Sequence, residues 1–157
     1  MYKRIFVPVD GSSAANRGLK EATRIARQQG ASLILFHAID ESFLAAAGDG
    51  MVLPDSLIPS LRDAGRKILA RALAVARKHR VRARAVLSER IVGAVADSII
   101  REARRFKADL IVMGTHGRRG VRRLVLGSDA EQVLRQTPVP VLLVRGAAAK
   151  ARRKASR

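Results

Sequence analysis

The chain of 157 residues contains no cysteine and no tryptophan, and only 3% of its residues are aromatic. Without cysteine there is neither a disulfide framework nor a thiolate metal site. The scarcity of aromatic side chains removes the stacking platforms that bind nucleic-acid bases. The longest stretch without a charged residue, 28–39, is too short to span a bilayer. The first ten residues also lack a leader-type apolar region, so we expect a cytoplasmic protein with no membrane contact.

Acidic residues are scarce as well. The 13 Asp and Glu residues face 31 Lys and Arg residues, which gives a net charge of +18. The excess concentrates in residues 61–84, in the loop 117–123 and in the last twelve residues. Such charge attracts polyanions. Because basic and aromatic residues do not alternate, we expect nonspecific adhesion at low salt and no specific nucleic-acid binding.

Apolar runs alternate regularly with helical periodicities. Strands are expected at 4–9, 32–37, 81–87, 109–113 and 141–144. Apolar residues at helical spacing predict helices from Ser12 or Ser13 to Gly30, over 61–76, over 95–106 and around 130–134. Strands that alternate with helices indicate a parallel sheet with helices on both faces. We expect one α/β domain over 1–146, a functional or mobile connection over 40–59, and a basic, disordered tail over 147–157.

A glycine-rich loop follows the fourth expected strand. Gly114-Thr-His-Gly117 is followed by nine residues and then by Gly127-Ser128. Glycine lets backbone N–H groups approach an anion closely, and Ser128 stands where a helix would begin, an environment that favours negative charge. The spacing therefore predicts a phosphate site, with a simple connecting turn as the alternative.

In an open parallel sheet, ligands bind beyond the carboxyl ends of the strands where the strand order reverses. Asp10 follows the first strand, 37–40 follow the second, and the glycine-rich loop follows the fourth. Asp10 could meet a ribose hydroxyl or, through water, a phosphate-bound Mg²⁺. It could equally cap the first helix beside Ser12 or Ser13.

These motifs resemble the ATP-binding branch of the universal stress protein family. Its signature of Gly, two residues, Gly, nine residues, Gly and Ser or Thr is met by Gly114, Gly117, Gly127 and Ser128. Similar segments surround it: Val7-Pro-Val-Asp-Gly-Ser12, Phe36-His-Ala-Ile-Asp40, Ala108-Asp-Leu-Ile-Val-Met-Gly-Thr115 and Thr137-Pro-Val-Pro-Val-Leu-Leu-Val144. The resemblance spans 2–145. It implies a Rossmann-like open sheet of five parallel strands in the order 3-2-1-4-5, similar to adenine-nucleotide alpha hydrolases, with two helices on each face.

The resemblance also implies where ATP would bind. By position, the adenosine half would be lined by Pro8, Val9 and Asp10, with the backbone of Ala38 at the adenine edge. Met113, Gly114 and Gly117 would flank the ribose and phosphates, which Gly127, Ser128, Asp129 and Ala130 would hold from the helix start. Asp129 departs from the small apolar residue common in the family, and its carboxylate would repel phosphates. Arg118 and Arg119 are placed to offset that charge.

The leading hypothesis is a stress-response sensor or adaptor that binds ATP, or else ADP or AMP, with little or no turnover and no catalytic residues. The alternatives are a slow ATPase or nucleotidyl-transferring enzyme on the same fold, and a polyanion-binding basic module. A protein partner, its identity unknown, would read the bound state. A homodimer is expected through the edge strand Val141 to Val144. His37 is expected to be a satisfied core histidine, and three scattered histidines predict no zinc site.

Overall fold

The structure is a computed structural model, and it describes residues 1–39, 54–88, 94–117 and 126–146. Five strands alternate with helices along these residues. The strands are β1 (Arg4–Pro8), β2 (Ser32–Ala38), β3 (Ala83–Ser88), β4 (Leu110–Gly114) and β5 (Val141–Val144). The described helices are α1 (Ser13–Gln29), α3 (Leu57–Lys78), α4 (Val95–Arg105) and α5 (Ser128–Gln136). The expected α/β alternation is therefore confirmed.

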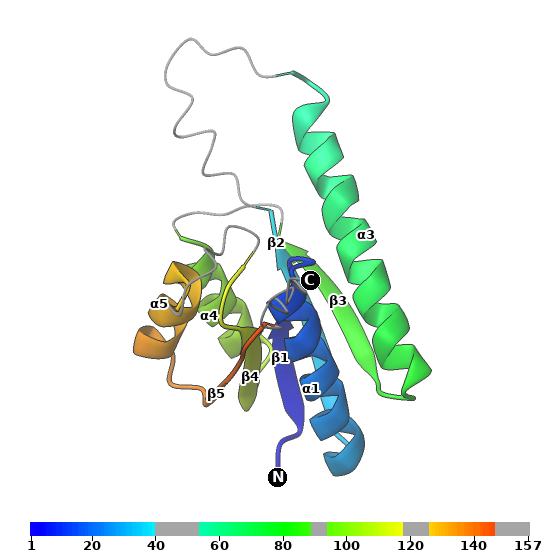
Figure 1. The fold of residues 1–157 in the computed structure, drawn as a ribbon, viewed down its shortest axis with the longest axis vertical. Coiled ribbons are helices and arrows are strands. Elements are labelled where there is room, and N and C mark those ends of the chain that lie inside the picture. The colour runs from blue at the N-terminus through cyan, green and yellow to red at the C-terminus, as the bar shows by residue number, and fades with distance from the viewer. Residues whose placement is uncertain (40–53, 89–93, 118–125, 147–157) are drawn as a thin grey trace, which may run out of the picture.

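The strands form one parallel sheet in the order β3-β2-β1-β4-β5, as expected. Helices α1 and α3 cover one face, and α4 and α5 cover the other (Figure 1). The order reverses at β1, which pairs with β2 on one side and with β4 on the other. The carboxyl ends of β1 and β4 therefore meet at the switch point, where such sheets bind ligands.

Alternation along the central strands divides the apolar side chains into two cores. On β1, Ile5 and Val7 point toward α1 and α3, whereas Phe6 points toward α4 and α5. The rings of Phe6 and Phe36 pack with their centroids 5.3 Å apart on that second face. Strands covered on both faces read as continuous apolar runs, which is why the sequence indicates them clearly.

Two signals in the sequence fix the ends of α1. Ser12 is the N-cap residue, and its Oγ accepts a hydrogen bond of 3.1 Å from the Ala15 N–H. Of the two candidates Ser12 and Ser13, it is therefore Ser12 that caps the helix. At the other end Gly30 adopts φ of 69°, the left-handed conformation that commonly closes a helix.

The expectation that 40–59 is all connection is wrong for its last three residues, because α3 begins at Leu57. Pro59 lies in the first turn of α3, where its missing N–H would have no intrahelical partner. A proline that looked like a loop residue is thus compatible with a helix start. Residues 40–53 and the tail 147–157 lie outside the described residues.

Within the described ranges, no helix is long and apolar enough to cross a membrane.

Candidate functional site

Asp10 lies one residue beyond Val9, where the chain leaves the sheet and turns into α1. Its Oδ1 accepts a hydrogen bond of 2.9 Å from the Ser12 N–H. The Ser12 hydroxyl, besides capping α1, is 3.5 Å from the carbonyl oxygen of His116 in the loop after β4. The carboxylate thus organises the turn that leads into α1, and the turn in turn contacts the loop after β4. Both readings of Asp10, helix-start residue and ligand contact, are compatible with this geometry.

Gly117 faces Asp10 across the switch point. A Cβ atom added at Gly117 would lie 2.9 Å from Oδ2 of Asp10, closer than such atoms pack. A larger residue at position 117 would therefore displace the Asp10 carboxylate, whereas glycine leaves the carboxylate in place. The residues that the sequence placed 107 positions apart are brought together at the carboxyl ends of β1 and β4.

Gly127 brings the end of the glycine-rich loop back to its beginning. Its N–H donates to the Thr115 carbonyl at 2.8 Å, and an added Cβ would lie 3.2 Å from that oxygen. Gly127 is also the N-cap residue of α5. Because its own N–H is already bonded to Thr115, this glycine positions the start of α5 rather than offering an N–H to an anion.

The N-terminus of α5 carries Ser128, Asp129 and Ala130 in its first turn. Ser128 and Asp129 are exposed, whereas Ala130 is buried against the second core. The first N–H groups of a helix have no partner within the helix and attract negative charge. The Asp129 carboxylate lies at this same end, with Glu131 in the same turn. Its negative charge interacts favourably with the helix dipole and would repel a phosphate bound there.

Three residues of the expected nucleotide site lie at strand ends on one face of the sheet. Met113 is buried in the core under α4 and α5, and Ala38 packs against that same core. Pro8 follows Phe6 by two positions and so shares its face. Val9 differs, because its side chain lies in the core on the α1 and α3 side. The structure therefore groups Pro8, Ala38 and Met113 and separates Val9 from them.

Close packing of α1 against β4 positions the Asp10 turn. A Cβ atom at Gly114 would lie 2.7 Å from the carbonyl carbon of Ala14, and one at Gly18 would lie 3.4 Å from that of Met113. Gly18 was not predicted from the sequence, because its position within a helix looked ordinary. The signal that could have found it is a glycine in an otherwise alanine-rich helix face, where alanine would be the better helix former.

Arg118 and Arg119, expected to offset the charge of Asp129, lie outside the described residues. Within the described ranges, no group of three or more His, Asp or Glu side chains could hold a metal ion. A single carboxylate such as Asp10 suits Mg²⁺ only as one ligand beside phosphate oxygens and water. The residues present thus fit Mg²⁺ delivered with a nucleotide better than a resident metal.

The other histidines have structural surroundings. His79 is exposed at the C-terminal end of α3. The Nδ1 of His116 is 3.0 Å from the Thr115 hydroxyl. His37 is buried, and its Nδ1 is 2.6 Å from the Val9 carbonyl, so the expectation of a satisfied core histidine is confirmed.

A shallow depression of about 560 Å³ lies elsewhere, between α1 and β5. Its lining is mostly basic and consists of Arg17, Lys20, Glu21, Arg24, Leu143, Val144 and Arg145. None of the residues expected at the nucleotide site belongs to it. We therefore treat the depression as a separate surface feature.

An open parallel sheet with a glycine-rich loop at its switch point defines a Rossmann-like protein of the kind that binds ligands at the strand ends. The family model for the universal stress protein family matches residues 1–145, and the chain belongs to this family. A universal stress protein of Thermus aquaticus is 36% identical over 92% of this chain and 100% of its own length. One from Methanocaldococcus jannaschii is 33% identical, covering 92% and 83%.

Solved structures agree on the fold and include nucleotide complexes. A hypothetical protein solved to assign its biochemical function matches with a TM-score of 0.80, at 25% identity over 95% of this chain and 99% of that one. An Archaeoglobus fulgidus universal stress protein in complex with dAMP matches at 0.65, with 26% identity over 91% and 98%. A universal stress protein in complex with cAMP also matches at 0.65, with 26% identity over 93% and 98%.

Proposed function

We propose that this universal stress protein binds an adenine nucleotide, ATP with Mg²⁺ first among them, at the carboxyl ends of β1 and β4. The observation that carries the proposal is the close approach of Gly117 to Asp10, where a side chain at position 117 would displace the carboxylate. A loop that passes this closely leaves its backbone, rather than a side chain, to face a ligand. Relatives in complex with dAMP and cAMP support the adenine class of ligand.

Each element would contribute one part of the contact. The backbone of Ala38 would meet the adenine edge, with Pro8 beside the base and Met113 beside the ribose. Asp10 would contact the ribose hydroxyls or, through water, Mg²⁺ held by the phosphates. Gly114 and Gly117 would flank the phosphates, and the N–H groups at the start of α5, from Ser128 to Ala130, would hold them. Val9 and Gly127 would act by positioning their neighbours, since their polar backbone groups are bonded within the protein.

Titration calorimetry with Mg-ATP tests this site. A valine at position 117 would press its Cβ atom against Oδ2 of Asp10 and displace this proposed ligand contact. Loss of one contact of about 1.4 kcal/mol corresponds to a tenfold loss of affinity, so we expect Gly117→Val to weaken binding about tenfold. The matched control is Gly30→Asn at the far end of α1, because nothing lies near Gly30 and asparagine tolerates its positive φ. No heat with the unaltered protein, or equal affinity in Gly117→Val, would contradict the proposal.

We propose that the bound nucleotide acts as a signal, read by a protein partner in the cytoplasm, and is not turned over. The turn Asp10-Gly-Ser-Ser13 holds no histidine that could serve its serines as a general base. The alternative, a slow ATPase or nucleotidyl-transferring enzyme, predicts repeated turnovers of ATP that Asp10→Asn abolishes. Product formation that stops at or below one equivalent per chain would favour the sensor, and sustained turnover would favour the enzyme.

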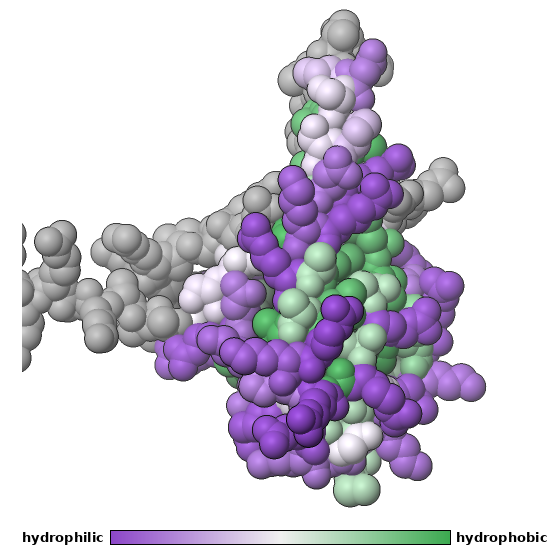
Figure 2. All heavy atoms as spheres, turned by 90° about the vertical axis from the view of Figure 1, so that its right-hand side faces the viewer, coloured by the Kyte–Doolittle hydropathy of each residue, from purple (hydrophilic) through white to green (hydrophobic). Residues whose placement is uncertain are grey.

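The basic outer surface of α3 supports a second candidate, a polyanion-binding module. Arg66, Lys67, Arg71, Arg77 and Lys78 are all exposed there. Figure 2 shows mostly hydrophilic side chains on this side of the molecule, around a smaller hydrophobic area, with the start of α3 projecting beyond the body. Filter binding across a salt series, with and without residues 146–157, measures this activity. Binding that vanishes by physiological salt would identify nonspecific adhesion.

We also propose a homodimer through β5, which is an edge strand of the sheet. Pro138 and Pro140 precede it and would limit pairing to the four residues of the strand. The basic depression beside β5 would place like charges near one another in the dimer. Light scattering should therefore detect dimers at micromolar concentration and a larger dimer fraction at higher salt. A monomer at every salt concentration would contradict this.

A further inference from the structure

His37 is a buried, titratable side chain that the proposed nucleotide contacts do not use. It is the penultimate residue of β2 and is 8% exposed. Its Nδ1 is 2.6 Å from the carbonyl oxygen of Val9. Because a carbonyl oxygen can only accept a hydrogen bond, Nδ1 carries the proton and donates it to Val9.

This hydrogen bond fixes the position of Val9, the residue that precedes Asp10. The Val9 N–H donates to the Phe36 carbonyl at 2.8 Å, so both polar backbone groups of Val9 are bonded to residues of β2. The last register pair of β1 with β2 is Pro8 with Phe36. His37 therefore continues the attachment of β1 to β2 for one further residue, through a side chain. Asp10 follows directly after this fixed residue.

The other side of the imidazole ring is held by α3. A Cβ atom added at Gly65 would lie 2.8 Å from Cδ2 of His37 and 2.8 Å from Cδ1 of Leu87. Gly65 is buried, so α3 packs directly onto the ring at this point. The ring is therefore enclosed between α3 and the end of β1 and cannot swing away from Val9 while α3 is in place.

We propose that His37 is a positioning residue for the nucleotide site. Its Nδ1–H fixes the Val9 carbonyl and with it the Asp10 turn, and Gly65 allows α3 to hold the ring in that orientation. The proposal rests on the proposed function, because the site that it supports is the nucleotide site. It also assigns α3 a part in nucleotide binding, although α3 supplies none of the proposed nucleotide contacts.

The test compares His37→Leu with His37→Asn by calorimetry with Mg-ATP. Leucine fills the space without a donor, whereas the asparagine amide can donate from close to the position of Nδ1. Losing a group that supports a ligand contact typically weakens binding about tenfold or more. We therefore expect about a tenfold loss of affinity in His37→Leu and near-normal affinity in His37→Asn. Equal affinity of His37→Leu and the unaltered protein, or an equal loss in both variants, would overturn the proposal.

A second variant acts from the helix side. Gly65→Ala pushes a methyl group against the ring while it improves helix propensity, so weaker binding could not be ascribed to a weaker α3. We expect it to lose affinity as His37→Leu does. Unchanged affinity in Gly65→Ala would overturn the role of α3. This variant also keeps the proposal open to refutation if His37→Leu fails to fold.

Amide hydrogen exchange without nucleotide separates this inference from the proposed function. The Ser12 N–H, which donates to Asp10, should lose protection in His37→Leu and keep it in His37→Asn. If the unaltered protein binds no nucleotide, the proposed function fails, and the exchange result still decides whether His37 positions the Asp10 turn. Equal protection of Ser12 in all three proteins would overturn the positioning role.

Discussion

Two aspartates lie at opposite ends of the strand pair formed by β1 and β4, and their hydrogen-bond partners differ. At the amino end, Asp109 accepts hydrogen bonds from the Lys3 N–H at 2.8 Å and the Arg4 N–H at 3.0 Å, one on each carboxylate oxygen. At the carboxyl end, Oδ1 of Asp10 accepts the Ser12 N–H of its own turn, while Oδ2 faces Gly117. Asp109 thus joins β1 to β4, whereas Asp10 lies at a boundary between a turn and a glycine-rich loop.

The difference shows how the two ends are held together. The amino end is closed by a carboxylate that bonds to backbone N–H groups across the two strands. The carboxyl end is held by close approach of α1 to β4 at Gly114 and Gly18. Because packing does this work at the carboxyl end, the carboxylate there need not bridge the strands. The aspartate at the amino end, Asp109, therefore has a structural role, whereas the aspartate at the carboxyl end, Asp10, is a candidate ligand contact.

The largest expected effect concerns the packing at the carboxyl end. Gly114→Ala would place a Cβ atom 2.7 Å from the backbone of Ala14, and neither segment can yield easily. We expect the free energy of unfolding to fall by about 3 kcal/mol, measured by urea denaturation. Gly146→Ala is the matched control, because its added Cβ would meet Ala14 at an ordinary 3.6 Å. Equal stability of Gly114→Ala and Gly146→Ala would contradict the role of close packing between α1 and β4 at the carboxyl end.

The next effect concerns the amino end. Asp109→Ala removes both hydrogen bonds to Lys3 and Arg4, and we expect it to lower the free energy of unfolding by about 2 kcal/mol. Asp109→Asn keeps one acceptor oxygen and should lose less. Affinity for Mg-ATP, measured on folded protein, should stay within about twofold, since Asp109 lies at the far end of the strands. A tenfold loss of affinity in Asp109→Ala would contradict the division of roles.

Asp10→Asn should show the opposite pattern. Its amide oxygen can still accept the Ser12 N–H, so the turn is kept and stability should change by less than about 1 kcal/mol. Losing the charge beside the ribose and Mg²⁺ should weaken Mg-ATP binding about tenfold, which corresponds to about 1.4 kcal/mol. Calorimetry and denaturation of the same preparation measure both quantities. Loss of stability without loss of affinity would make Asp10 a helix-start residue only.

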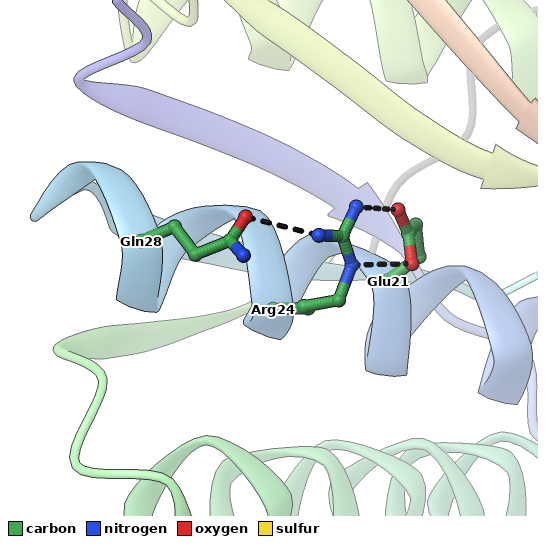
Figure 3. Close-up of polar contacts among 3 residues, drawn as sticks. All are labelled: Glu21, Arg24 and Gln28. Atoms are coloured by element: carbon green, nitrogen blue, oxygen red, sulfur yellow. Dashed lines mark hydrogen bonds and ion pairs between the residues drawn. The ribbon is translucent and has the colours of Figure 1, made fainter.

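The smallest effect belongs to an exposed pair on α1, remote from both aspartates. Arg24 donates to Glu21 through Nε at 3.1 Å and through Nη2 at 2.6 Å, and Nη1 donates to Gln28 at 3.0 Å (Figure 3). The hydrogen bond from Arg24 lowers the pKa of Glu21 below its ordinary value of 4.5. The pair therefore stabilises the fold above that value and loses its contribution as pH falls through the lowered pKa.

Because Arg24 is exposed and Glu21 is partly exposed, Glu21→Gln should lower the free energy of unfolding by no more than about 0.5 kcal/mol at pH 7. The difference between the two proteins should shrink toward zero in acid. Denaturation of both proteins at pH 7 and in acid, below the lowered pKa of Glu21, measures this difference. A loss as large as that of Asp109→Ala would mean that surface charge, rather than the strand ends, dominates stability.

The positions of the strands and helices could be predicted because buried parallel strands leave continuous apolar runs in the sequence, whereas the strand order was implied by the resemblance to the universal stress protein family. The spacing of the glycine-rich loop indicated Gly114, Gly117 and Gly127. The sequence did not distinguish Ser12 from Ser13 as the N-cap residue of α1, because the N-cap is decided by which hydroxyl accepts the Ala15 N–H.

Contacts between distant residues were not predictable. Nothing near Asp109 in the sequence indicates that Lys3 and Arg4 bind it, because the pairing of β1 with β4 creates that contact. The bonds that occupy Val9 and Gly127 were hidden for the same reason. The start of α3 was misjudged because Pro59 signals a loop unless its place in a first helical turn is known.

The proposed nucleotide site lies at the carboxyl end of the β1 and β4 pair. Amide chemical shifts recorded while Mg-ATP is added would locate the bound nucleotide, because both ends of the pair are observed in one experiment. We expect large shifts for the N–H groups of Gly11, Ser12 and Gly117, and none for Lys3 and Arg4. Shifts confined to α1 and β5 beside the basic depression, or no shifts at saturating nucleotide, would contradict it.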